Sequence, residues 1–181
     1  MPLTDPMLVV QVVGSAFSLL AGIAAWLSAA AAKRAAVATE RATQAQLLNS
    51  LLDAYSSSEM LSSMMTLRAW GTKHGKHAAD EFRRLRQEDY PSIQDVDFAR
   101  RRVSHFFQKI YALHAAGHLD EPSVRLAAPR GQVDFFREII EPLEAAISVN
   151  YDRSSFDGLG SMYGIGPSLP AMANPSLQRA G

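Results

Sequence analysis

The sequence lacks cysteine altogether, and it lacks an excess of charge of either sign. Without cysteine the chain can form no disulfide, no thiolate metal site and no thiol nucleophile. Lysine and arginine together number 18, and aspartate and glutamate together also number 18. This balance gives no overall field that would draw the chain to a polyanion, so we do not expect nucleic acid as a partner.

Charged side chains are also missing from residues 7–32, MLVVQVVGSAFSLLAGIAAWLSAAAA. A bilayer core needs about 20 mostly apolar residues in one helix, and this run exceeds that length. Asp5 is the charged residue before the run, whereas Lys33 and Arg34 follow it directly. Because basic residues favour the cytoplasmic side, we expect a short N-terminal segment (1–6), one transmembrane helix (7–32) and a C-terminal domain in the cytoplasm.

Three alternatives to a transmembrane helix have less support for this apolar run. A cleaved signal peptide would begin with basic residues and have a shorter apolar region. A buried helix of a soluble protein would need a larger core than the rest of the chain provides. An amphipathic surface helix would carry a charged face, which the run lacks. We therefore favour a membrane anchor, with the lipid bilayer as a partner.

Small residues recur every four positions within the run, at Gly14, Ser18 and Gly22. This spacing lets two helices approach closely in lipid and is typical of helix-packing surfaces. Glycine is also frequent in membrane helices in general, so chance is an alternative. The pattern indicates a candidate helix-packing surface, for self-association or for pairing with another membrane helix.

Glycine and proline are missing between Gly22 and Gly71, and the intervening residues are mostly good helix formers. We expect the membrane helix to continue as a helical stalk (33–46) into a helical domain (47–157). Too few apolar heptads survive in the stalk region to predict a coiled coil.

Apolar residues at helical spacing predict four or five helices within the domain. Ser56 and Glu59 have capping-box spacing, so we expect a helix that starts near Ser57 and stops at Gly71. Pro91 should end the next helix. The remaining predicted boundaries are a long helix capped by Asp95 or Asp97 that ends at Gly117, a short helix opened by Asp120 or Glu121, and a kink or restart at Pro142.

Three consecutive arginines precede two phenylalanines in DFARRRVSHFFQKIYALHAAGHLDE, residues 97–121. The phenylalanines fall on the apolar stripe of a helix, so we expect them in a core and not stacked on bases. Arg100, Arg101 and Arg102 lie in the first turns of that helix, where the helix dipole disfavours cations. We expect ion pairs with the acidic residues nearby, Glu88, Asp89, Asp95 and Asp97. The alternative is a patch that binds phosphate or lipid headgroups.

Motifs that carry chemistry are missing. The sequence has no P-loop, dinucleotide fingerprint or nucleophile elbow. His114 and His118 have a metal-binding spacing, but the predicted helix ends between them and no third ligand is indicated. Glu138, Glu141 and Glu144 share one predicted helix, which we interpret as a solvated acidic face. We expect no catalytic residue, no cofactor and no metal.

Three segments, YSSSEM, DFARRRVSHFFQKIYALHAAGHLDE and EPLEAAISVNYD, lie between Leu47 and Phe156. Their pattern resembles a family of small, membrane-anchored bacterial proteins that is classed only as a domain of unknown function. The resemblance implies a helical cytoplasmic domain behind an anchor in the bacterial inner membrane. It implies no activity, cofactor or catalytic residue.

Residues 158–181 are rich in glycine, proline, serine and alanine, with Arg179 as their single charge. This composition predicts a disordered tail. The whole sequence predicts an all-α protein, in which one transmembrane helix continues into a small cytoplasmic helical bundle. We expect a non-enzymatic interaction or scaffold protein that assembles with itself or with another protein. The alternative is a nucleic-acid or anionic-lipid sensor that uses Arg100, Arg101 and Arg102.

Overall fold

The computed structural model describes residues 6–148 and 151–166, with side chains from residue 24 onward. All regular structure in these residues is helical, which confirms the predicted all-α class. The chain divides into two compact units, residues 1–45 and 46–181. The division lies next to the boundary at which the sequence predicts the stalk to meet the domain.

The first unit consists of one helix, α1 (Pro6–Ser56), whose last residues belong to the second unit. Its uninterrupted course follows from the long stretch without proline. Among the described residues, no helix combines the length and the apolar character that a membrane crossing needs. Gly14, Ser18 and Gly22 lie in the part of α1 whose side chains are not described, as do residues 7–23 of the predicted membrane helix.

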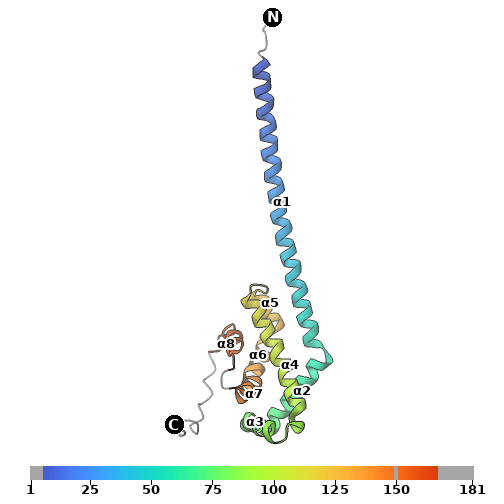
Figure 1. Ribbon diagram of the computed structural model, residues 1–181, viewed down its shortest axis with the longest axis vertical. Helices are drawn as coiled ribbons and strands as arrows, with labels where there is room; N and C mark the ends of the chain where they lie inside the picture. The colour runs from blue at the N-terminus through green and yellow to red at the C-terminus, as the bar shows by residue number, and fades with distance from the viewer. Residues whose placement is uncertain (1–5, 149–150, 167–181) are drawn as a thin grey trace. The chain divides into compact units, whose positions relative to one another are not determined.

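The second unit is a helical bundle, seen in the lower half of Figure 1. The C-terminal turns of α1 contribute Leu51 to its core. The helices that follow are α2 (Ser58–His74), the 3₁₀ turn η1 (Gly75–His77), α3 (Ala78–Glu88), α4 (Tyr90–Ala115), α5 (Glu121–Ala127), α6 (Arg130–Phe135), the π-helical turn η2 (Phe136–Ile140), α7 (Glu141–Ile147) and α8 (Ser154–Ser161).

α4 is the central helix of this bundle. It packs against α2, α3, α5, α8 and η2, and α3 packs in turn against α7. The core contains a column of stacked rings: the centroids of Phe107 and Phe136 lie 4.6 Å apart, and those of Phe136 and Phe156 lie 4.2 Å apart. Phe106 is also buried. The two phenylalanines that follow the arginine run are therefore core residues, as the sequence predicts.

α2 starts near Ser57, as predicted, but its capping residue and its end differ from the prediction. Its N-cap is Ser57, whose hydroxyl accepts a hydrogen bond from the Met60 amide, and not Ser56. Gly71 does not end the helix, which continues to His74 and stops at Gly75, where φ is +54°. Gly71 has a packing role instead, because a Cβ there would lie 3.0 Å from Ile139 Cδ1.

The start of α4 is also earlier than predicted. Pro91 lies in the first turn of this helix, at a position where its missing N–H costs no hydrogen bond. Asp95 and Asp97 therefore lie inside the helix and do not cap it. The other end agrees with the prediction, because Gly117 has a φ of +76° just beyond the last turn.

Two predicted helix starts near the C-terminus are confirmed, and one predicted boundary is wrong. The Asp120 carboxylate accepts from the Ser123 amide at 2.9 Å and caps α5. α7 restarts with Pro142 in its first turn, directly after the π-helical turn. The predicted start of the tail at Gly158 is too early, because α8 runs to Ser161 and buries Leu159 completely. Residues 167–181 lie outside the described residues.

Candidate functional site

The first candidate site is the arginine run of α4, and its first member is buried. Arg100 is 6 % exposed, and Asp97, one turn before it, is 0 % exposed. The Arg100 guanidinium donates to Asp97 Oδ1 from Nη2 at 2.8 Å and from Nε at 3.1 Å. Arg101 donates to the other carboxylate oxygen of Asp97 at 2.7 Å. One carboxylate thus accepts from both arginines and balances one of their two positive charges.

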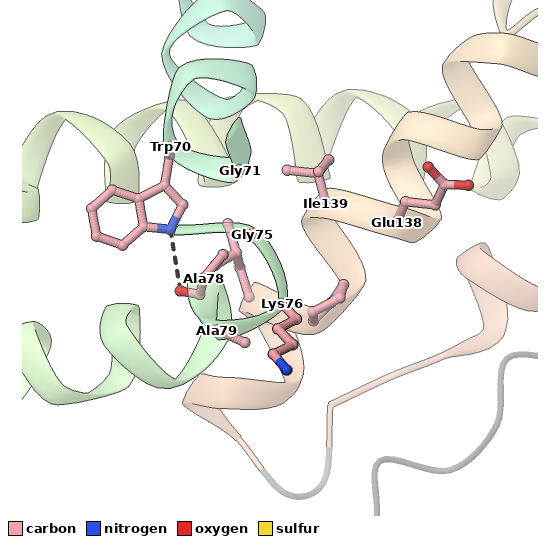
Figure 2. Close-up of a pocket in the computed structure, with 10 residues that line it drawn as sticks. Trp70, Gly71, Gly75, Lys76, Ala78, Ala79, Glu138 and Ile139 are labelled. Carbon is pink, nitrogen blue, oxygen red and sulfur yellow. Dashed lines mark hydrogen bonds between the residues drawn. The ribbon is translucent and has the colours of Figure 1, made fainter. Parts of the chain in front are cut away.

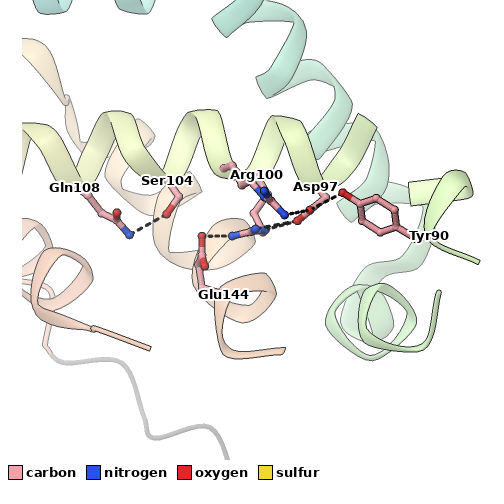
Figure 3. Close-up of polar contacts among 7 residues, drawn as sticks. Tyr90, Asp97, Arg100, Ser104, Gln108 and Glu144 are labelled. Atoms are coloured by element: carbon pink, nitrogen blue, oxygen red, sulfur yellow. Dashed lines mark hydrogen bonds and ion pairs between the residues drawn. The ribbon is translucent and has the colours of Figure 1, made fainter. Parts of the chain in front are cut away.

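A second carboxylate completes this cluster from another helix. Glu144 of α7 accepts from Arg100 Nη1 at 2.5 Å, and Tyr90 donates its hydroxyl to Asp97 at 3.1 Å (Figure 3). We call Tyr90, Asp97, Arg100, Arg101 and Glu144 the buried arginine network. It fastens α7 to α4 inside the bundle. Its members form hydrogen bonds and ion pairs with one another, which is typical of a structural network.

The electrostatics of Asp97 agree with this role. Burial by itself raises the pKa of the Asp97 carboxyl, but the hydrogen bond and charge of Arg100 and the Tyr90 hydroxyl outweigh it. The net result is a pKa below the ordinary value. Asp97 is therefore a carboxylate at neutral pH and is unsuited to act as a general acid.

Arg102 lies on the outer side of α4 and binds α2. Its Nη1 donates to the Glu59 carbonyl oxygen at 3.2 Å and to the Ser63 hydroxyl at 3.1 Å. No carboxylate pairs with Arg102 among the described residues. The Arg102 side chain is exposed, so its charge remains open to solvent.

An open groove of about 380 Å³ runs beside Arg102, between α2 and α4. Phe98, which lines the groove, is 49 % exposed. This α2–α4 groove is lined by Ser62, Ser63, Thr66, Asp95, Phe98, Ala99 and Arg102. It combines one half-exposed aromatic ring with one charge of each sign.

A smaller cavity of about 140 Å³ lies where α2, η1, α3, η2 and α7 meet (Figure 2). The Trp70 indole forms part of its wall and donates from Nε1 to the Ala78 carbonyl at 3.2 Å. Lys76 and Glu138 also line it, and their charged groups lie apart in Figure 2. The volume resembles that of a cavity that holds one benzene ring. The cavity can shelter a small apolar group, but it brings no acid and base together.

A second buried carboxylate lies near the end of the bundle. Glu141 is 5 % exposed and accepts a hydrogen bond from the Tyr151 hydroxyl at 2.9 Å, with Arg153 Nε 3.4 Å away. Burial and this bond to Glu141 together raise the pKa of Tyr151 to about 12. The predicted solvated acidic face is therefore wrong for Glu141 and Glu144, which are both committed to partners.

The histidines show no metal-binding arrangement. His114 Nδ1 lies 2.9 Å from the Leu119 carbonyl oxygen, which ties the end of α4 to the loop that follows. In the described part of the chain, no three side chains of the metal-binding types come together.

Sequence reasoning found one of the partners of the arginine run and missed the others. Asp97 was among the four acidic residues expected to pair with it, whereas Glu88 pairs with Arg84 and Asp95 is exposed. Glu144 lies 44 positions from Arg100, and no local pattern connects the two. The α2–α4 groove has no signal in the local sequence pattern, because its lining residues come from two helices about 30 positions apart.

Comparison of the chain with protein-family models, with curated proteins and with solved structures finds no match.

Proposed function

We propose that this chain is a membrane-anchored, non-enzymatic interaction protein whose docking surface is the α2–α4 groove. One observation carries the proposal. Asp97 and Arg100 are paired within the buried arginine network, whereas the groove presents the half-exposed ring of Phe98 beside the open charges of Asp95 and Arg102. Aromatic and arginine side chains are enriched in protein–protein contacts.

The anchoring part of the proposal rests on residues 7–32, which carry no charge and are followed by Lys33 and Arg34. We propose a single crossing of the bacterial inner membrane with residues 46–181 on the cytoplasmic side. An anchored domain without a catalytic cluster can act by holding a partner near the bilayer.

The alternative, a nucleic-acid or anionic-lipid sensor that uses Arg100, Arg101 and Arg102, has less support. Arg100 is buried and paired, and Arg101 shares the carboxylate of Asp97. Arg102 alone faces solvent without a carboxylate among the described residues. One open guanidinium binds a polyanion weakly, because affinity for phosphates grows with the number of cations that contact them.

Site-specific photo-cross-linking in cells tests the docking surface. A benzophenone side chain in place of Phe98 lies at the groove, and the same side chain at Leu126 of α5 is the matched control. Both positions are exposed apolar residues, at 49 % and 59 %. We expect a protein adduct from position 98 and none from position 126. No adduct from position 98, or equal adducts from both positions, would contradict the proposal.

An alkaline carbonate wash of membranes tests the anchor separately. We expect the full chain to stay in the pellet and a chain without residues 1–32 to be released. A full chain that washes off would mean that the apolar run packs within protein, and the anchoring part of the proposal would be wrong.

A further inference from the structure

The groove carries one negative and one positive side chain, which lie on either side of Phe98 along α4. Asp95 and Arg102 both line the groove, and they are seven residues apart on one helix. Seven residues are close to two helical turns, about 10.5 Å along the axis. Both charges therefore point to the same side of α4. Phe98 lies near the middle of this interval, between the negative and the positive end.

Neither charge is neutralised by an ion pair among the residues that the structure describes. Asp95 is exposed and makes no hydrogen bond or ion pair in the part of the chain that the structure describes. Arg102 donates only to a carbonyl and a hydroxyl of α2. A complementary partner would therefore place a positive group beside Asp95 and a negative group beside Arg102, with the same spacing between them as these two residues have.

We propose that the occupant of the α2–α4 groove is the same groove of a second copy of this chain. In a two-fold contact, residue i meets residue j and j meets i. If two copies of α4 lie antiparallel and centred between Phe98 and Ala99, Asp95 of each faces Arg102 of the other. The exposed ring of Phe98 then packs near the two-fold axis. A single copy supplies every group that this arrangement needs.

The size of the groove indicates a weak pair in isolation. Seven residues line the groove, whereas each side of a stable dimer interface usually contributes about 20–30 residues. Anchoring both copies in one membrane raises their effective concentration and compensates for weak contacts. The inference therefore rests on the proposed function for its docking surface and for its membrane setting, and the experiments use the full chain in membranes.

Cross-linking between introduced cysteines reports the geometry, and the chain has no native cysteine to confuse it. Two differently tagged full-length copies, one with Asp95→Cys and one with Arg102→Cys, are coexpressed and treated with a short bismaleimide. We expect a strong mixed cross-link between the two copies. One Asp95–Arg102 pair stays intact in this mixed dimer. The matched controls are two copies with Asp95→Cys, or two with Arg102→Cys, whose thiols are offset by about two turns along the helix and should cross-link weakly.

Strong cross-links in the matched pairs and weak ones in the mixed pair would indicate a parallel contact and would overturn the arrangement. A thiol that links to a protein of another mass would overturn self-pairing while leaving the docking surface in place. If no thiol links to anything, and position 98 gives no adduct, the docking surface itself fails. The two proposals can therefore fail separately.

Charge reversal is the sharper test. Asp95→Arg alone and Arg102→Asp alone each place like charges opposite one another at both ends of the contact. We expect each variant to associate with itself roughly tenfold more weakly, as two exposed ion pairs become repulsive. A mixture of the two variants restores both attractive pairs, so energy transfer between donor-labelled and acceptor-labelled copies in vesicles should return. The melting temperature of Asp95→Arg should stay within about 2 °C of the parent chain, because Asp95 is exposed. Arg102→Asp also loses two hydrogen bonds to α2 and should melt a few degrees lower while it stays folded.

The anchor is unchanged in all these variants, so association through residues 7–32 gives a constant background. Energy transfer that is equal in the parent, in each single variant and in the mixture would overturn the inference. Energy transfer that is lost in each single variant and returns only in the mixture supports the inference. Binding to a foreign partner or a general loss of folding would not restore it.

Discussion

The inner and the outer sides of α4 each carry an aspartate and an arginine, yet only the inner pair is neutralised within the domain. Asp97 and Arg100 are buried and bonded to each other, with Glu144 of α7 as a further partner. Asp95 and Arg102 are exposed, and neither pairs with an opposite charge in the described residues. Both pairs consist of an aspartate and an arginine in the first half of α4. They differ because the buried pair has a carboxylate partner on a distant helix, whereas the exposed pair has none among the described residues.

The largest expected difference between the two sides is in the free energy of unfolding. Asp97→Ala leaves the buried guanidinium of Arg100 with fewer partners and should lower stability by about 3–5 kcal/mol. Asp95→Ala is the matched control and should change stability by less than about 0.5 kcal/mol. Denaturant unfolding of the full chains in detergent, followed by near-ultraviolet circular dichroism, measures both. Equal losses would mean that the inner and outer aspartates have the same role.

A smaller loss of stability is expected where the C-terminal half of α4 packs against α8. A Cβ at Gly158 of α8 would lie 2.1 Å from Cε2 of Tyr111 on α4. Gly158→Ala should therefore cost about 1–3 kcal/mol, as overpacking usually does. Gly131→Ala is the control, because nothing lies within 4 Å of its added Cβ, and it should be neutral or stabilising by up to about 1 kcal/mol. If Gly158→Ala is also neutral in thermal unfolding, α8 does not belong to the folded bundle.

Sequence reasoning predicted well those features that depend on neighbouring residues. The helical class, the burial of Phe106 and Phe107, the cap at Asp120 and the turn at Gly117 all follow from local spacing and local backbone chemistry. The same reasoning predicted correctly that the preceding helix, α3, ends before Pro91, but it misplaced the start of α4. Pro91 follows α3 and also lies in the first turn of α4, a second use that the prediction did not consider.

The candidate sites were less predictable, since their members come from distant parts of the chain. Glu144 reaches Arg100 across 44 positions, and Ser63 reaches Arg102 across 39. Gly71 has the local character of a helix end, but its close contact with Ile139 accounts for it better. The buried π-helical turn that presents Ile139 also has no sequence signature that local rules detect.

The buried aspartate, Asp97, should also make the stability of the domain depend on pH in acid. The pKa of Asp97 is lower in the folded state than its ordinary value, which is about 3.9 in an unfolded chain. The carboxylate therefore adds stability above that pH, and this contribution disappears as the pH falls through the lower folded pKa. Asp97→Asn should flatten the loss of stability below about pH 4. Asp120, whose pKa the hydrogen bond from Ser123 also lowers, leaves a residual slope. Unfolding curves from pH 2 to pH 6 on both chains measure the difference, and identical slopes would contradict it.

The smallest expected effect on stability is that of the outer phenylalanine. Phe98 is 49 % exposed, whereas Phe107 is 0 % exposed and stacks on Phe136. Phe98→Ser should change the free energy of unfolding by less than about 0.5 kcal/mol, since serine and phenylalanine have similar helix propensities. Phe107→Ser should cost at least about 3 kcal/mol. Phe98→Ser should nevertheless weaken association between copies in vesicles, because it removes the apolar centre of the proposed contact. A residue that contributes little to folding but much to association is what separates a binding surface from a core. If Phe98→Ser unfolds the domain, or if it leaves association unchanged, the outer side of α4 is not the docking surface.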